Sequence, residues 1–197
     1  LSIIENALWP ILEAGFTVTI PLALISFALS LVLAVLTAVM RISKSRLLKG
    51  LAWFYVWVFR GTPLLIQLFI VFFGLPKLNI TLDAWTAAIL TFALNSGAYS
   101  AESIRGAILA IPRGQWEAAD SLGMTNGQVL KRIIFPQTVR IALPAVMNDF
   151  ISLVKSTSLA SSITIIEMTM VGQQFASVTY EPLILYMEVA VIYLLIS

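Results

Sequence analysis

The 197-residue sequence contains no cysteine and no histidine, and only 11% of its residues are charged. Without cysteine there are no disulfides and no thiol nucleophiles, and without histidine there is no imidazole base or imidazole metal ligand, so we expect no metal site. Soluble domains carry about 25% charged residues. With 59% hydrophobic residues and a mean hydropathy of +0.95, the composition is that of an integral membrane protein.

Long uncharged segments indicate membrane-spanning helices. The first has 25 residues, and at about 1.5 Å per residue it is long enough for a hydrocarbon core of about 30 Å. We predict an all-α integral membrane protein with one transmembrane domain over residues 1–197 and about five spans, at 16–40, 51–75, 84–104, 140–166 and 182–197. The last span is short, so we expect the chain to continue. Glu5 and Glu13 stand where a cleaved secretory signal would have a basic region.

The connections between these segments differ in their content of Lys and Arg, which cytoplasmic loops retain and translocated loops largely lack. Two connections are rich in them, with Arg41, Lys44, Arg46 and Lys49 in the first, and Arg105, Arg113, Lys131, Arg132 and Arg140 in the loop at 105–140. The connection at 76–83 has Lys77 alone, and residues 156–182 have none. We predict an outside N-terminus and a cytoplasmic 105–140 loop. Because the basic residues lie beside spans, we expect no nucleic-acid partner.

The loop at 105–140 is the one sizeable polar segment of the chain. Residues 115–122 have the composition of a short helix, which Gly123 is well placed to end. Thr125 and Gln128 form a capping-box pattern at the start of a second helix. The loop is too short to bury a core of its own, so we expect it to dock on a partner.

Trp116 lies within the first of these helices and is the largest apolar side chain of the polar segment. Tryptophan is enriched at binding hot spots, which favours a docking surface. A solvated loop and a tryptophan at the membrane interface are the alternatives.

The same loop carries a signature within 20 residues: Glu117-Ala118-Ala119, then Gly123, then Ile133-Ile134-Phe135-Pro136. It resembles the cytoplasmic signature of ATP-binding-cassette (ABC) importer permeases, with Phe135 where that family has leucine. Four further segments resemble the permeases for polar amino-acid uptake: FRGTPLLIQLF at 59–69, NSGAYSAESIRGAI at 95–108, GQWEAADSLGM at 114–124 and FISLVKSTSLASSI at 150–163. The resemblance implies a type I importer-permease fold. It also implies that the coupling to an ATPase runs through Trp116, Glu117, Ala118, Ala119 and Gly123.

The resemblance implies a transport subunit that works by alternating access and is not itself an enzyme. No G-x4-G-K-[ST] phosphate-binding loop occurs in the chain, so ATP and Mg would be bound by a separate partner. The implied partners are two ABC ATPase subunits, a second or homologous permease, an extracellular or periplasmic amino-acid-binding protein, and membrane lipid. The implied location is a prokaryotic plasma membrane. The quoted segments fit cystine, glutamine, arginine, lysine or histidine as cargo.

Polar residues within the predicted spans are candidates for a substrate pathway, because ionisable side chains are costly at that depth. Asn95, Tyr99 and Glu102 share one face of the third span. In the fourth, Ser156, Thr157 and Ser158 suggest a local unwinding, with a new helix N-terminus that suits a substrate carboxylate. Glu167 could meet a cationic group. For each residue the alternative is a hydrogen bond within the protein, or for Glu102 an interfacial charge beside Arg105.

Lys155 and Arg60 are the two basic residues inside predicted spans. We expect Lys155 to pair with a carboxylate, either Asp149 or one on another chain. Arg60 precedes Pro63, which predicts a kink in the second span because proline removes a helix hydrogen bond.

Two other functions remain open at the level of the sequence. An ion-coupled secondary amino-acid carrier is the first, although such carriers usually contain two repeats and this chain shows none. A membrane-embedded enzyme is the second, and the absence of histidine and cysteine disfavours it.

Overall fold

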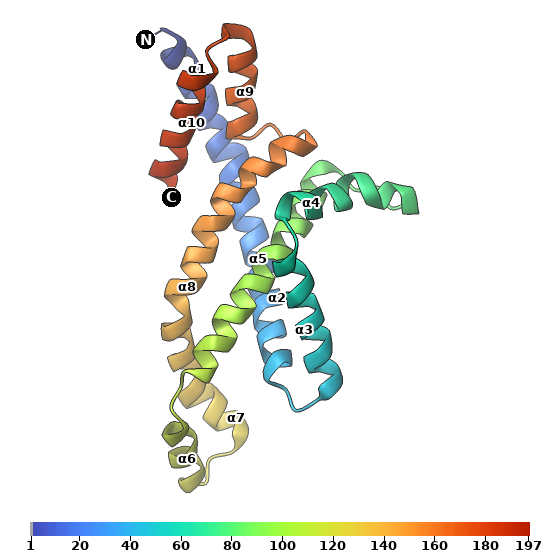
Figure 1. Ribbon diagram of the computed structural model, residues 1–197. Coiled ribbons are helices and arrows are strands. Elements are labelled where there is room, and N and C mark those ends of the chain that lie inside the picture. Colours follow the sequence, from blue (N-terminus) through green and yellow to red (C-terminus); the bar gives the residue numbers. More distant parts are fainter. Residues whose placement is uncertain (1) are drawn as a thin grey trace.

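The computed structural model describes residues 2–197, and within them the backbone is helical apart from short connections (Figure 1). The all-α class predicted from the sequence is confirmed. In chain order the elements are α1 (Ser2–Ala14), η1 (Gly15–Thr19), α2 (Ile20–Ile42), α3 (Arg46–Gly61), α4 (Leu64–Phe69), η2 (Ile70–Gly74), η3 (Leu75–Leu78), α5 (Ala84–Leu109), α6 (Arg113–Ser121), α7 (Asn126–Val129), η4 (Leu130–Ile134), α8 (Phe135–Ser156), η5 (Thr157–Ile163), α9 (Met168–Thr179) and α10 (Pro182–Ile196).

Bends divide two of the predicted spans. The span predicted at 51–75 falls on α3 and α4, and the α3 segment makes an angle of 105° with the segment that begins at α4. Pro63 lies at this bend and has no N–H with which to continue α3. The span predicted at 140–166 stops being α-helical at Ser156, and the chain is bent by 52° before α9. The first span is longer than predicted, since one helix runs over Ile3–Ile42.

Within the described residues, one helix is long and apolar enough to cross a membrane, and up to three are if each bent pair is one span. Helix α5 has sufficient length, but its polar residues lower its hydropathy. Helix α10 is apolar and has 15 residues. The five predicted segments are therefore all helical, while length and composition single out fewer of them as spans.

Helix α5 is the centre of the molecule, with α2 along one side and α8 along another (Figure 1). The face of α2 toward α5 buries mainly small residues, among them Ser30 and Ala34. A close approach occurs at Gly97 of α5, where a Cβ atom would lie 3.0 Å from the Tyr55 hydroxyl of α3, 3.1 Å from Leu33 Cβ and 3.3 Å from the Ser30 carbonyl oxygen. Small residues permit such close packing between membrane helices, where no hydrophobic drive holds them together.

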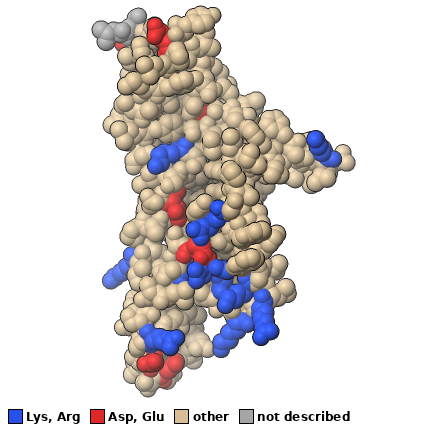
Figure 2. Space-filling model, viewed as in Figure 1, with Lys and Arg blue, Asp and Glu red and all other residues tan. Residues whose placement is uncertain are grey.

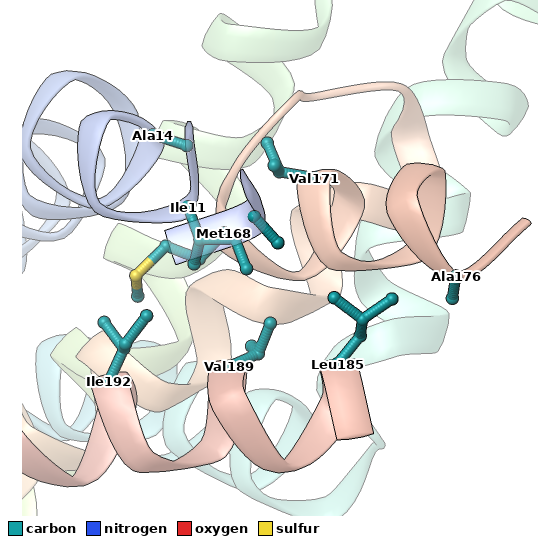
Figure 3. Close-up of a cluster of buried hydrophobic side chains, with 9 residues drawn as sticks. Ile11, Ala14, Met168, Val171, Ala176, Leu185, Val189 and Ile192 are labelled. Atoms are coloured by element: carbon teal, nitrogen blue, oxygen red, sulfur yellow. The ribbon is translucent and has the colours of Figure 1, made fainter. Parts of the chain in front are cut away.

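A second packing centre lies at the end of the molecule that carries α1, α9 and α10. In Figure 3, apolar side chains from these three helices point toward one another, and the buried cluster includes Ile11, Met168, Leu185, Val189 and Ile192. Helices α6 and α7 extend from the opposite end (Figure 1). The polar site described next lies between these two ends, on α5 and α8.

Candidate functional site

A polar cavity of about 380 Å³ lies between α5 and α8. Helix α5 supplies side chains with three- and four-residue spacing, and α8 supplies side chains four residues apart, so each helix lines the cavity with one face. The lining residues are Asn95, Ser96, Tyr99, Asn148, Asp149, Ser152, Leu153 and Ser156. Amide, hydroxyl and carboxylate groups thus gather beside helices that are otherwise strongly apolar.

Asp149 is the one acidic residue of this lining, and it is half-buried. Its Oδ2 atom accepts hydrogen bonds from the hydroxyls of Ser100, at 2.9 Å, and Ser103, at 3.3 Å. Among the described residues its other oxygen accepts no hydrogen bond. The carboxylate is therefore held in place by α5 and keeps an oxygen for a ligand, which suits an ammonium group.

Asn95 and Tyr99, both predicted as pathway residues, do line the cavity. The Asn95 amide nitrogen is occupied, because it donates to the Phe59 carbonyl and to Gln67 Oε1, both at 3.0 Å. Only the Asn95 oxygen is left for a ligand. The guanidinium of Arg60 lies 5.1 Å from the centre of the Tyr99 ring, a cation–π contact.

A second cavity of about 390 Å³ lies on the other side of Tyr99 and contains Glu102. Its lining is Arg41, Trp53, Val56, Trp57, Arg60, Gly61, Tyr99 and Glu102. Glu102 forms ion pairs with Arg41, at 3.1 Å, and Arg105, at 2.8 Å. The Glu102 carboxylate, which was predicted to meet a substrate, is thus neutralised by two arginines. Its ion pair with Arg41 joins the end of α2 to α5.

The segment 156–158 differs from its predicted geometry. The chain leaves the α-helix there, but it is not unwound as predicted, since η5 is a 3-10 helix, which is wound more tightly. The helix N-terminus predicted there is also wrong, because η5 continues directly from Ser156, the last residue of α8. Only Ser156 of the three lines the polar cavity. Thr157 is buried and donates to the Val154 carbonyl, and Ser158 donates to the Lys155 carbonyl. These carbonyls lose their helical N–H partners where the α-helix ends, so the hydroxyls serve as replacement donors.

Glu167 caps α9 and is fully buried. Its oxygens accept hydrogen bonds from the N–H groups of Thr169 and Met170 and from the hydroxyl of Tyr193. A carboxylate at a helix N-terminus is stabilised by the free N–H groups and the helix dipole. The carboxylate does not line the polar cavity, and the cationic-substrate role predicted for it stays a prediction.

Lys155 and Asp149 form no ion pair in the structure, so that predicted pairing is wrong within the chain. Lys155 is exposed and lines a cavity between the end of α8 and α10, together with Tyr186 and Tyr193. Asp149 faces α5 instead.

Sequence reasoning overlooked most of the α8 side of the cavity. Asn148, Ser152 and Ser156 are spaced by four residues and therefore share one helix face. Ser156 was predicted, and the spacing that identified the α5 residues could have identified Asn148 and Ser152 as well.

The loop at 105–140 forms a helical hairpin with a small core. Ile111, Ala119, Val129 and Ile134 are buried in it, and Trp116 packs against them. The expectation that this loop buries no core of its own is therefore wrong. Glu117 and Ala118, on the other side of α6, are exposed.

The predicted local geometry of the hairpin is confirmed. Gly123 has φ +68° and follows α6. Its N–H donates to the Asp120 carbonyl and that of Met124 to the Ala119 carbonyl, which is the Schellman arrangement. The capping box of Thr125 with Gln128 is also present.

Basic side chains are distributed unevenly over the molecule. In Figure 2 they gather in the half that carries the α2–α3 connection and the α6–α7 hairpin, and they are scarce toward α1 and α9. Such a gradient along a bundle of apolar helices is typical of a membrane protein with one cytoplasmic end.

These features together define a membrane permease: apolar, broken helices lined with polar groups, and a packed helical hairpin projecting from the basic end. The chain belongs to the family described as binding-protein-dependent transport system inner membrane component, whose profile matches residues 30–197. It is thus a member of a family of integral inner-membrane proteins, as the resemblance implied.

Individual relatives narrow the group to ABC permeases for amino acids. The L-cystine transport system permease protein TcyB of Bacillus subtilis is 45% identical over 196 residues, which cover 99% of this chain and 84% of that protein. The nopaline transport system permease protein NocM of Agrobacterium fabrum is 41% identical and is covered to the same extents. The resemblance to ABC importer permeases for amino acids, seen in the sequence, is confirmed.

Solved structures agree on the fold. A crystal structure of an amino acid ABC transporter with histidines superposes with a TM-score of 0.92 at 35% identity, covering 100% of this chain and 91% of the other. An inward-facing MetNI methionine ABC transporter gives a TM-score of 0.70 at 20% identity over 99% of this chain and 90% of that one, which supports the fold alone. The importer-permease fold predicted from the resemblance is confirmed.

Proposed function

We propose that this chain is the transmembrane subunit of an ATP-driven importer for a polar amino acid, and that the cavity between α5 and α8 is part of its substrate pathway. The observation that carries the proposal is the Asp149 carboxylate, oriented by two serine hydroxyls in a polar cavity beside apolar helices. A free amino acid must exchange its hydration for fixed polar groups. Asp149 and the Asn95 oxygen receive the ammonium, and the hydroxyls of Ser152 and Ser156 serve the other polar groups.

The relatives support a polar amino acid as the cargo. Besides those named for L-cystine and nopaline, others are named for octopine and arginine. We infer that the cargo is cystine, glutamine or a basic amino acid. An ion-coupled secondary carrier, the alternative left open by the sequence, gains no support, since these relatives are permeases of ABC systems.

We infer the assembly around the chain from its exposed groups and from the family. Arg60 and Lys155 are exposed among the membrane helices, where contact of a charged group with lipid is costly, so a second copy or a homologous permease covers these groups. Two ABC ATPase subunits, which bind ATP and Mg, complete the assembly, and the α6–α7 hairpin of this chain docks on one of them through Trp116, Glu117 and Ala118. Ala119 and Gly123 shape the hairpin. An external binding protein delivers the amino acid at the opposite end.

The proposed transporter has a defined orientation in the membrane and couples ATP to two conformations. The basic end, with the hairpin, lies in the cytoplasm of a prokaryote and the N-terminus lies outside, in keeping with the distribution of Lys and Arg. ATP shifts the inward and outward populations because the ATPase dimer binds nucleotide with different affinity in the two states.

The test compares Asp149→Asn with Asp120→Asn, an exposed acid in the hairpin, in the assembled transporter. ATP hydrolysis is measured against rising L-cystine, L-arginine and L-glutamine, each with the binding protein present. A charge-assisted hydrogen bond contributes about 1.5–3 kcal/mol, so Asp149→Asn should raise the half-stimulating concentration roughly tenfold or more and leave basal hydrolysis unchanged. Equal curves for the two variants and the wild type would remove Asp149 from the pathway.

A further inference from the structure

The bend between α3 and α4 leaves a backbone carbonyl without its helical partner. In a continuous helix the Phe59 carbonyl would accept from the N–H of residue 63, and Pro63 has none. The chain turns by 105° at this point. A carbonyl left unpaired near apolar surroundings is destabilising, so the bend needs a donor from elsewhere.

Two side-chain amides supply donors there. Gln67 of α4 is 7% exposed, and its Nε2 atom lies 2.9 Å from the Phe59 carbonyl, 3.0 Å from the Thr62 carbonyl and 2.7 Å from the Thr62 hydroxyl. Asn95 of α5 donates to the same Phe59 carbonyl and to Gln67 Oε1, both at 3.0 Å. We call Gln67 and Asn95, with the Phe59 carbonyl that they share, the amide clamp.

The amide clamp joins the bend to both cavities. Asn95 lines the polar cavity, whereas Gln67 does not. Arg60 follows Phe59 directly, and Tyr99 lies one turn beyond Asn95, so the clamp fixes the two backbones that bring Arg60 over the Tyr99 ring. Tyr99 lines both cavities. Beside the Tyr55 hydroxyl, which donates to the Leu94 carbonyl, an amide that also faces the cavity therefore helps to position α3 relative to α5.

We propose that Gln67 is a positioning residue that makes the α3–α4 bend respond to the contents of the polar cavity. An ammonium that donates to the Asn95 oxygen polarises the Asn95 amide, and hydrogen-bonded chains strengthen one another, so the Asn95 bonds to Gln67 and Phe59 become stronger. Occupancy then narrows the range of angles between α3 and α4. This inference rests on the proposed function, because it takes the cavity as a substrate site.

The natural absence of cysteine allows the bend to be measured with spin labels. Leu51→Cys on α3 and Leu78→Cys on η3 replace exposed residues on the two arms of the bend. Electron–electron double resonance in nanodiscs, on the assembled transporter, gives the distribution of distances between them. Gln67→Met removes the amide at similar volume, and Gln67→Glu is a second variant that removes the donor. Gln137→Met, on α8, is the control, since Gln137 donates to the Ile133 carbonyl of its own helical segment, at 3.0 Å, and to Gln115 Oε1 of the hairpin, at 3.4 Å, both away from the bend and from the two cavities.

We expect wild type and Gln137→Met to show a narrower distribution when the amino acid and the binding protein are added, and both Gln67 variants to show a broad one throughout. One hydrogen bond contributes about 1 kcal/mol, so the ratio of amino-acid-stimulated to basal ATP hydrolysis should fall about fivefold in the Gln67 variants. The half-stimulating concentration should rise by up to about the same factor, because a bond that the ligand strengthens must in turn favour binding of the ligand, although Gln67 itself does not line the cavity.

The outcomes separate this inference from the proposed function. If L-cystine, L-arginine and L-glutamine all leave the wild-type complex unstimulated, the proposed function is overturned, and this inference with it. If the wild type is stimulated but the Gln67 variants keep its distances and its ratio, only the role of Gln67 is overturned. A fall of basal and stimulated rates in equal proportion, with an unchanged ratio, would also overturn it, since that result describes a loss of stability alone.

Discussion

The turn at Gly123 provides a quantitative test of how the α6–α7 hairpin is built. Gly123 has φ +68°, and no atom lies within 4 Å of the place where a Cβ would stand. Gly123→Ala therefore causes no clash and changes only the backbone preference. An L-residue in the left-handed conformation costs about 1–2 kcal/mol. Two hydrogen bonds depend on the turn, Gly123 N–H to the Asp120 carbonyl at 2.9 Å and Met124 N–H to the Ala119 carbonyl at 3.1 Å.

A cost of this size raises the open population of the hairpin roughly 5- to 30-fold. Hydrogen exchange followed by mass spectrometry, on peptides that cover residues 113–135, should show a matching increase in amide exchange for Gly123→Ala. The control is Gly127→Ala in α7, which also has free space but no positive φ. It should slow exchange slightly, because alanine is favoured over glycine in a helix by up to about 1 kcal/mol. Unchanged exchange in Gly123→Ala, or an equal increase in the control, would refute the reasoning.

Three further substitutions test the packing, the charge balance and the docking surface. Gly97→Ala should lower the free energy of unfolding by about 1–3 kcal/mol, because the new Cβ meets the backbone of α2. Gly106→Ala, on the same helix, has free space and should not destabilise the protein. Thermal unfolding in detergent compares the two variants. Glu102→Gln leaves two arginines without their shared carboxylate and should lower the free energy of unfolding by about 2 kcal/mol. The same assay should therefore show a lower unfolding midpoint. A midpoint equal to that of the wild type would mean that the ion pairs contribute nothing to stability. Trp116→Ala should weaken binding of the ATPase by at least about 2 kcal/mol, or some thirtyfold in affinity, and so reduce copurification. Trp9→Ala, at the far end of the molecule, should leave copurification unchanged. Equal recovery of the ATPase with both variants would exclude Trp116 as an anchor.

Local features of this protein could be predicted from the sequence because neighbouring residues determine them. Gly123 ends α6 since few other residues adopt its backbone conformation, and the capping box at Thr125 needs only a residue three positions away. Apolar composition likewise sufficed for the membrane class and the helical fold. The kink at Pro63 followed from the missing N–H, although its size did not.

Contacts between distant segments were beyond such reasoning. Asn95 has the spacing of a pathway residue, but its amide is occupied by Phe59, which lies 36 positions earlier. Glu167 could be assigned as a cap only once the start of α9 was known. Asp149 was one of the two partners expected for Lys155, the other being a carboxylate of another chain, yet it accepts hydrogen bonds from serines of α5 instead. In each case the tertiary packing decides which of several polar partners is within reach.

Uptake into proteoliposomes tests the central claim most directly. The permease is reconstituted with its ATPase and binding protein, with ATP on the side of the α6–α7 hairpin, and labelled L-cystine, L-arginine and L-glutamine are supplied on the other. The account predicts accumulation of at least one of these amino acids that requires both ATP and the ATPase subunit. Accumulation by the permease alone, driven by an ion gradient and indifferent to ATP, would contradict it.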